Sequence, residues 1–131
     1  MSNSPTKGEA MVLQSCILFF SMLNQIDPAV TKAVIKVESS GRPFAIGHSH
    51  QEIGLMQIRD KYVPESSLQL FNPCTNVMRG TQILGKLKAD CKMCIDKVYV
   101  NAYNLGVSGS KKLRHPRLWK YHKKVLLAMG E

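Results

Sequence analysis

The stretch DPAVTKAVIKVESSG, residues 27–41, carries the signals of a complete amphipathic helix. Asp27 is a good N-cap residue, and Pro28 behind it suits the first helical position. The apolar residues that follow recur at the i, i+3, i+4, i+7 spacing of one helix face: Val30, Ala33, Val34 and Val37. Two serines and a glycine at 39–41 suit a helix C-cap. We therefore predict a helix that runs from about residue 28 to about residue 39.

This predicted helix ends on an acid, Glu38, where acids are disfavoured. The C-terminus of a helix is the negative end of its macrodipole, so it favours the neutral form of a carboxyl group by about half a pKa unit. Glu38 also lies beside the apolar face, at the edge of the core, where partial burial raises the pKa further. The alternative from the helix alone is a solvated surface glutamate.

Length and composition predict one globular domain over residues 1–131, with a loose start at 1–8. The chain has 131 residues, of which 44% are hydrophobic, and this size is sufficient for a core of its own. Its net charge of +9 favours polyanionic partners such as nucleic acid, anionic lipid or wall polymers. Seven of the basic residues lie between Lys111 and Lys124 without an acid. They are interpreted as a solvated helix face or as a polyanion-binding patch.

The four cysteines, at 16, 74, 91 and 94, do not form a zinc-binding pattern, because the pair Cys91–Cys94 has no second pair to complete four ligands. We expect reduced, structural cysteines, with a Cys91–Cys94 disulfide as the alternative. The apolar run at 10–23 is too short to span a bilayer. It lacks the flanks of a signal peptide, so we expect a buried first helix over about 9–24.

Further helices are predicted after Asn72–Pro73, over about 95–105, and after His115–Pro116. The inner face of the first of these, which runs to about Lys88, is formed by Val77, Gly80 or Thr81, Leu84 and Leu87. The apolar run at 53–58 is either a brief strand or the entry to a turn. The fold class is mostly α, with at most a small strand element.

Four separated pieces carry a family resemblance. They are ESSGRP at 38–43, GLMQI at 54–58, NPCTNVMRG at 72–80 and AYNLG at 102–106. In this order and spacing, from about Ile26 to Leu127, the chain resembles the soluble lytic transglycosylase domain family, which is related to goose-type lysozyme. YHKKVL at 121–126 also resembles the closing helix of that family.

The resemblance implies a lysozyme-like α-helical domain with a glycan-binding cleft. It implies cleavage of the β-1,4 bond between N-acetylmuramic acid and N-acetylglucosamine in peptidoglycan, with Glu38 as the catalytic acid. It also implies the residues that contact the sugar: Ser39 after the glutamate, Met56 and Gln57 lining the cleft, and Tyr103 and Asn104 near the acid. Each has a structural alternative: core packing for Met56, a loop amide for Gln57, a packed aromatic for Tyr103 and a helix-end residue for Asn104.

The choice between lytic cleavage and hydrolysis depends on a second carboxylate, because hydrolysis needs one as base or nucleophile. Asp27 lies about 16 Å from Glu38 along a continuous helix. Glu52 and Asp60 flank GLMQI, but neither matches a family motif position. We therefore expect formation of a 1,6-anhydro product without metal or cofactor. The alternatives are a hydrolytic muramidase and a non-enzymatic wall-binding or nucleic-acid-binding module that uses the basic C-terminal helix. Against the binding module, packing explains the aromatic residues of that helix, Trp119 and Tyr121.

The expected partner is the peptidoglycan glycan strand, with no nucleic acid and no membrane insertion, and we expect a monomer. The expected place of action is the bacterial cell wall, in the periplasm. Since no signal peptide is evident, the chain fits a bacteriophage lysin or virion component, or a domain of a larger exported bacterial enzyme.

Overall fold

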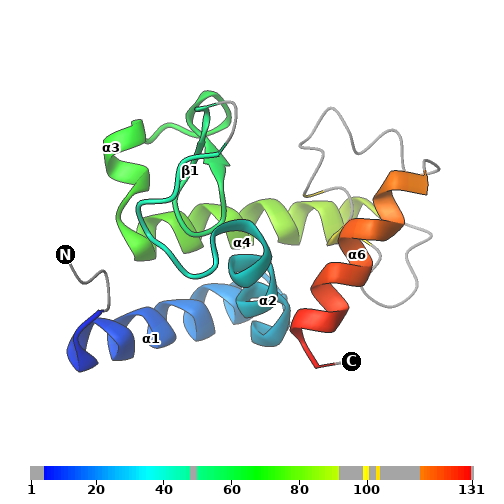
Figure 1. The fold of residues 1–131 in the computed structure, drawn as a ribbon, viewed down its shortest axis with the longest axis horizontal. Helices are drawn as coiled ribbons and strands as arrows, with labels where there is room; N and C mark the ends of the chain where they lie inside the picture. Colours follow the sequence, from blue (N-terminus) through cyan, green and yellow to red (C-terminus); the bar gives the residue numbers. More distant parts are fainter. Residues whose placement is uncertain (1–4, 48–49, 92–98, 101–102, 104–115, 131) are drawn as a thin grey trace.

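The computed structural model describes residues 5–47, 50–91, 99–100, 103 and 116–130, and it is mostly helical, as predicted (Figure 1). The described helices and strands are α1 (Lys7–Leu23), α2 (Pro28–Ser39), β1 (Glu52–Ile53), β2 (Ile58–Arg59), α3 (Ser67–Leu70), α4 (Pro73–Asp90) and α6 (Pro116–Ala128). A 3-10 turn, Asp60–Tyr62, follows β2. This architecture is that of a lysozyme-like α domain with a small two-stranded sheet.

Helix α1 begins two residues before its predicted start because a capping box fixes it. The Thr6 hydroxyl accepts a hydrogen bond from the Glu9 backbone N–H, and the Glu9 carboxylate accepts one from the Thr6 N–H. The expectation that α1 is buried is wrong for most of its surface. Only Ile17 and Ser21 are buried, because α1 packs against α4 and α2 on one side only.

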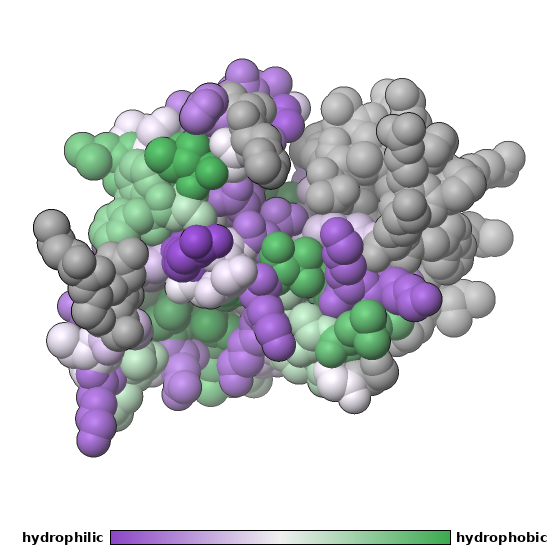
Figure 2. All heavy atoms as spheres, viewed as in Figure 1, coloured by the Kyte–Doolittle hydropathy of each residue, from purple (hydrophilic) through white to green (hydrophobic). Residues whose placement is uncertain are grey.

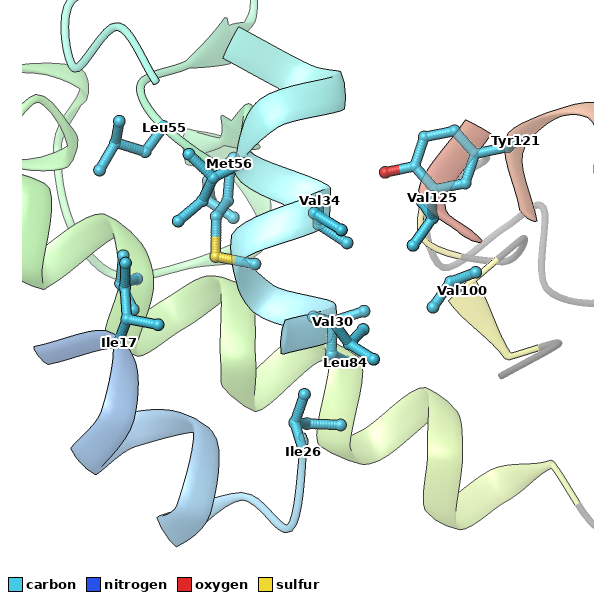
Figure 3. Packing of buried hydrophobic residues seen from close by; sticks show 14 of the residues in the cluster. Ile17, Ile26, Val30, Val34, Leu55, Met56, Leu84, Val100, Tyr121 and Val125 are labelled. Carbon is cyan, nitrogen blue, oxygen red and sulfur yellow. The ribbon is translucent and has the colours of Figure 1, made fainter. Parts of the chain in front are cut away.

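Helix α2 has the predicted bounds and the predicted start. The Asp27 carboxylate accepts a hydrogen bond from the Ala29 N–H at 2.9 Å. The helix ends at Ser40, which adopts the left-handed conformation one residue before the glycine expected there. α2 contacts both α1 and α6, so its apolar face is covered: Val30, Ala33, Val34 and Ile35 are buried. Figure 3 shows Val30 and Val34 in the core, with Leu84 of α4 and Val125 of α6.

The run at 53–58 forms both predicted alternatives, since it is a turn between two short strands. β1 and β2 pair antiparallel, with Glu52 opposite Arg59 and Ile53 opposite Ile58. The buried Asn76 side chain of α4 holds this hairpin. It accepts a hydrogen bond from the Met56 N–H at 2.8 Å and donates to the carbonyl oxygens of Ile53 and Leu70 at 2.8 and 2.9 Å.

Helix α4 buries the predicted inner face: Val77, Gly80, Thr81, Leu84 and Leu87. Within this face, Gly80 leaves room for the Met56 side chain of the hairpin, whose sulfur would lie only 2.2 Å from a Cβ added at Gly80. Gly85 leaves room for the backbone of Asn24 at the end of α1, because a Cβ added at Gly85 would lie only 2.8 Å from the Asn24 carbonyl oxygen. The predicted helix over 95–105 lies largely outside the described residues, although Tyr99 and Val100 are described and buried.

The expectation of reduced cysteines is wrong. Cys16 of α1 and Cys74 of α4 form a disulfide, and Cys91 is also disulfide-bonded. The packing of α1 on α4 brings the Cα atoms of Cys16 and Cys74 to 5.6 Å across 58 residues of sequence, a pairing that no local spacing reveals. Cys94, the other half of the C-x-x-C pair, lies outside the described residues. In the part of the chain that the structure describes, no helix combines the length and the apolar character needed to cross a bilayer.

Candidate active site

The site forms around Glu38, in the last turn of α2. Its side chain is partly buried, and its Oε1 accepts a hydrogen bond of 2.9 Å from the Tyr121 hydroxyl of α6. Figure 3 shows this hydroxyl directed from α6 toward α2. The contact between α2 and α6 therefore places a carboxyl group against a buried phenol.

Burial is the largest influence on the Glu38 carboxyl, and it raises the pKa from 4.5 to about 7. The negative charge of Glu52 raises this pKa as well, while the Tyr121 hydrogen bond and the positive charge of Lys124 lower it. At neutral pH a large fraction of Glu38 therefore carries a proton. This is the state from which a general acid acts.

Tyr121 is the site residue that the sequence analysis missed, because its aromatic ring was attributed to packing. The ring is buried, but the hydroxyl contacts Glu38. Burial, followed by the nearby Glu38 carboxylate, raises the pKa of Tyr121 well above 10, so the phenol stays protonated and donates. The segment YHKKVL, noted only as a family-like closing helix, contained the signal.

Tyr103 lies at the same place. Its hydroxyl donates a short hydrogen bond to the Met56 carbonyl oxygen, and burial followed by the charge of Glu38 raises its pKa well above 10. Tyr103 also contributes to the raised pKa of Tyr121. Two protonated phenols therefore lie near one carboxyl group.

Met56 and Gln57, which were expected to line the cleft, instead make contacts within the protein. The Met56 side chain is fully buried against Gly80 and lines no open surface, and only its carbonyl oxygen meets Tyr103. The Gln57 backbone is left-handed, and its amide donates to the carbonyl oxygens of Ala45 and Gly54 at 3.2 and 3.0 Å. Both residues thus hold the hairpin in shape, and any contact with sugar stays a prediction.

Ser39 is also directed inward, with 2% of its surface exposed. Its hydroxyl donates to the Ile35 carbonyl at 3.0 Å and accepts from the Gly41 N–H at 3.2 Å, so it closes the end of α2. Asn104 lies outside the described residues.

The two carboxylates considered for hydrolysis have different surroundings. Glu52 is paired with Arg59 at 2.9 Å, partly buried, and close enough to Glu38 to raise its pKa. The second oxygen of Glu52 lies over Gly47, where an added Cβ would be 2.5 Å away. Asp60 accepts a hydrogen bond from the Ser67 hydroxyl at the surface. Glu52 is therefore the carboxylate that is electrostatically coupled to Glu38.

The surface near the site includes a pocket formed by residues 42–46, the loop that follows α2. Phe44 in this loop is largely exposed, and its ring packs against the Phe71 ring, with 5.8 Å between the two ring centroids. From the basic C-terminal segment, Lys123 and Lys124 are described and exposed. The positive charge of Lys124 lowers the pKa of Glu38, so this part of the basic segment lies near the carboxyl group. Among the described residues, no three His, Cys, Asp or Glu side chains are placed to hold a metal ion.

Comparison with known proteins agrees with this geometry. The family model described as "Transglycosylase SLT domain" matches residues 15–124, which is most of the chain. No curated protein and no solved structure matches the chain significantly.

Proposed function

Since the chain belongs to the transglycosylase SLT domain family of peptidoglycan lytic transglycosylases, we propose that it cleaves the β-1,4 bond between N-acetylmuramic acid and N-acetylglucosamine and leaves a 1,6-anhydro end. The observation that supports this proposal most is the carboxyl group of Glu38, with a pKa of about 7, between α2 and α6. An acid with this pKa is matched to proton transfer near neutral pH.

In the first step Glu38, in its protonated form, donates its proton to the glycosidic oxygen. The bond from this oxygen to C1 of the muramic acid breaks, and positive charge develops at C1 and the ring oxygen. The Glu38 carboxylate that remains is negative and lies next to this charge, so it stabilises the charge-separated state.

In the second step the Glu38 carboxylate removes the proton of the C6 hydroxyl of the same muramic acid. The C6 oxygen then forms a bond to C1 and closes the 1,6-anhydro ring. Glu38 ends the cycle protonated again, with the proton of the C6 hydroxyl in place of the one it gave to the leaving oxygen. One carboxyl group therefore serves as acid and then as base, and no water is consumed.

The two tyrosines have roles in keeping with their hydrogen bonds. Tyr121 occupies Oε1 of Glu38 at 2.9 Å, which orients the carboxyl group and leaves Oε2 for the substrate. Tyr103 donates to the Met56 carbonyl, and burial followed by the charge of Glu38 raises the pKa of its phenol, so a protonated hydroxyl stands close to the acid. We assign the sugar-binding surface to the 42–46 loop, with exposed Phe44 as an apolar platform for a sugar ring.

Hydrolysis is the second candidate, and the coupling of Glu52 to Glu38 is the observation that favours it. A water held by Glu52 would attack C1 in place of the C6 hydroxyl. Two features weigh against this route. Arg59 pairs with Oε1 of the Glu52 carboxylate, so this oxygen already has a partner, and a 1,6-anhydro closure needs no second carboxylate.

The decisive experiment digests purified peptidoglycan in ¹⁸O water and analyses the products by mass spectrometry. We expect products that are 18 mass units lighter than reducing-end muropeptides and carry no ¹⁸O. Reducing ends that carry ¹⁸O would refute lytic cleavage and would assign the water-activating role to Glu52, which Glu52→Gln then tests.

A matched pair of variants tests the assignment of Glu38. We expect Glu38→Gln to lose roughly 10²- to 10⁴-fold in lytic activity, because glutamine keeps the shape but has no proton to donate. Glu9→Gln, at the exposed start of α1, keeps its capping box and serves as the control with wild-type activity. Retention of more than a tenth of wild-type activity by folded Glu38→Gln would remove Glu38 from its role.

A further inference from the structure

The outward face of α1 is covered by large apolar side chains that meet no other part of the described structure closely enough to be buried. Six of them are between 52% and 69% exposed: Met11, Val12, Leu18, Phe19, Met22 and Leu23. They recur along one side of the helix at intervals of three, four and seven residues. We call this set the α1 apolar face. In Figure 2, some apolar side chains reach the surface between hydrophilic ones in the lower left of the view, where Figure 1 places α1.

The α1 apolar face contains no charged residue, since none occurs between Ala10 and Asn24. Ser15, the polar residue on this face, donates its hydroxyl to the Met11 carbonyl at 3.0 Å and so needs no water. Six large side chains that are more than half exposed amount to several hundred square ångströms. That is the size of the largest apolar patch on a typical monomer, and such patches mark binding sites.

The face is held outward by the fold. The Cys16–Cys74 disulfide ties α1 to α4, and the opposite side of α1 is packed through Ile17 and Ser21. The Ser21 hydroxyl shares a buried hydrogen bond of 2.7 Å with Thr31 of α2. Helix α1 therefore cannot turn its apolar residues inward, nor can it leave the domain to cross a bilayer while the disulfide is intact.

Cations stand at both ends of the α1 apolar face. Lys7 opens the helix, and Lys88 reaches its other end by donating to the Gln25 carbonyl oxygen at 2.6 Å. Both lysines are exposed, and the whole chain carries a net charge of +9. Glu9, in the first turn, accepts a hydrogen bond from the Thr6 N–H within the capping box. An apolar helix face with terminal cations on a basic domain is complementary to an anionic lipid surface.

We propose that α1 docks the domain onto an anionic lipid bilayer. The helix lies in the plane of the surface, with its apolar face about 5–10 Å into the boundary between headgroups and acyl chains. Lys7 and Lys88 stay at the level of the headgroups and contact lipid phosphates. This interfacial docking departs from the expectation of no membrane insertion. It goes beyond cleavage of the glycan, and it lies on an element other than those that bear Glu38 and Tyr121.

The test is co-sedimentation with vesicles of equal parts phosphatidylglycerol and phosphatidylcholine at 0.1 M salt. We expect the wild-type protein to bind, and Phe19→Ser/Met22→Ser to bind at least tenfold more weakly. Leu68→Ser/Leu127→Ser is the matched control, because these leucines of α3 and α6 are 81% and 64% exposed and lie off α1. The control should bind as the wild type does.

Three results would overturn the proposal: wild-type protein that stays in the supernatant, equal binding by the α1 variant, and equal loss by the control. A wild-type dimer that the α1 variant converts to a monomer, without vesicle binding, would assign the face to a second copy of the chain instead.

A second measurement does not depend on loss of binding. Tryptophan fluorescence of Phe19→Trp should shift to the blue and be quenched by brominated lipid, beyond the change seen with wild type, while Leu68→Trp should show neither effect. Absence of both changes in Phe19→Trp would equally refute the docking.

Discussion

Helices α1 and α2 follow each other in the chain, are both rich in apolar residues, and have opposite fates. α2 is covered by α1 and α6 and buries Val34 completely, whereas α1 is covered on one side and leaves Phe19 in solvent. The inner helix positions Glu38, and the outer one is fastened by a disulfide. Apolar composition thus predicts that a helix packs its apolar side chains against another surface. The place of the helix in the fold determines whether that surface is the core of the domain.

The largest effect that we expect concerns the fastening of α1. Cys16→Ser/Cys74→Ser removes a cross-link over 58 residues, and the loop-closure model attributes about 4 kcal/mol of unfolding free energy to a loop of this length. Urea unfolding of the double variant measures the loss. A loss below about 1 kcal/mol would show that packing alone holds α1, and the Ala/Ala variant checks that the serine hydroxyls are not responsible.

The next effect compares truncation on the two helices. Ile35→Ala in the buried face of α2 should cost about 3 kcal/mol of unfolding free energy, because it leaves a cavity in the core. Leu18→Ala on the exposed face of α1 should change it by less than about 0.5 kcal/mol. Similar losses in urea unfolding would mean that the α1 apolar face is covered in solution.

A third expectation concerns the stability cost of the acid on α2. The pKa of Glu38 is raised from 4.5 to about 7 in the fold, so the folded state binds this proton more tightly. The resulting stability is fully present below pH 4.5 and is lost as the pH rises through 7. Glu38→Gln does not titrate, so it should be more stable than wild type by up to about 3 kcal/mol at pH 8.5 and equal to it at pH 4.

Thermal or urea unfolding at the two pH values measures this difference, with Glu9→Gln on α1 as the control that should follow wild type. A gain for Glu38→Gln that is the same at pH 4 and pH 8.5 would contradict the titration of Glu38 as its source.

The smallest effect concerns the hydrogen bond that α6 supplies to α2. Tyr121→Phe removes a donor to the Glu38 carboxylate, and this donor lowers the pKa of Glu38. We expect kcat/KM to fall about tenfold, the equivalent of roughly 1.4 kcal/mol. The alkaline limb of the pH–activity profile should move to higher pH. Tyr62→Phe, on an exposed ring, is the control. A shift of the limb to lower pH would contradict this account of the hydrogen bond.

Local patterns in the sequence were sufficient for the elements and for the acid. The cap at Asp27, the apolar spacing in α2 and the inner face of α4 are readable because each depends on residues within one or two turns. The position of Glu38 at a helix end beside the core was predictable for the same reason. The size of its pKa change was not, since it depends on burial by α6, more than eighty residues away.

What the sequence could not reveal are the contacts between distant elements. The Cys16–Cys74 pairing, the hydroxyl of Tyr121 on Glu38 and the placement of Met56 over Gly80 each join residues far apart in the chain. The same limit applies to the outer face of α1. An apolar run in the sequence has the same pattern whether other elements cover both sides of the helix or only one side. The motif left two interpretations of Met56 open, a residue that lines the cleft and a core residue, and only its neighbours in three dimensions reveal that its side chain is fully buried.

The single amide of Asn76 has a kinetic consequence. It binds the Met56 N–H and the Ile53 carbonyl of the hairpin, and also the Leu70 carbonyl of α3, so the tip of the hairpin cannot lift from α4 without the loss of two buried hydrogen bonds. The Met56 amide proton should therefore exchange with solvent only when the domain unfolds as a whole, among the slowest in the molecule. The carbonyl of the same residue accepts the Tyr103 hydroxyl, so the hydrogen-bond acceptor for the ring beside Glu38 stays in place until the domain unfolds.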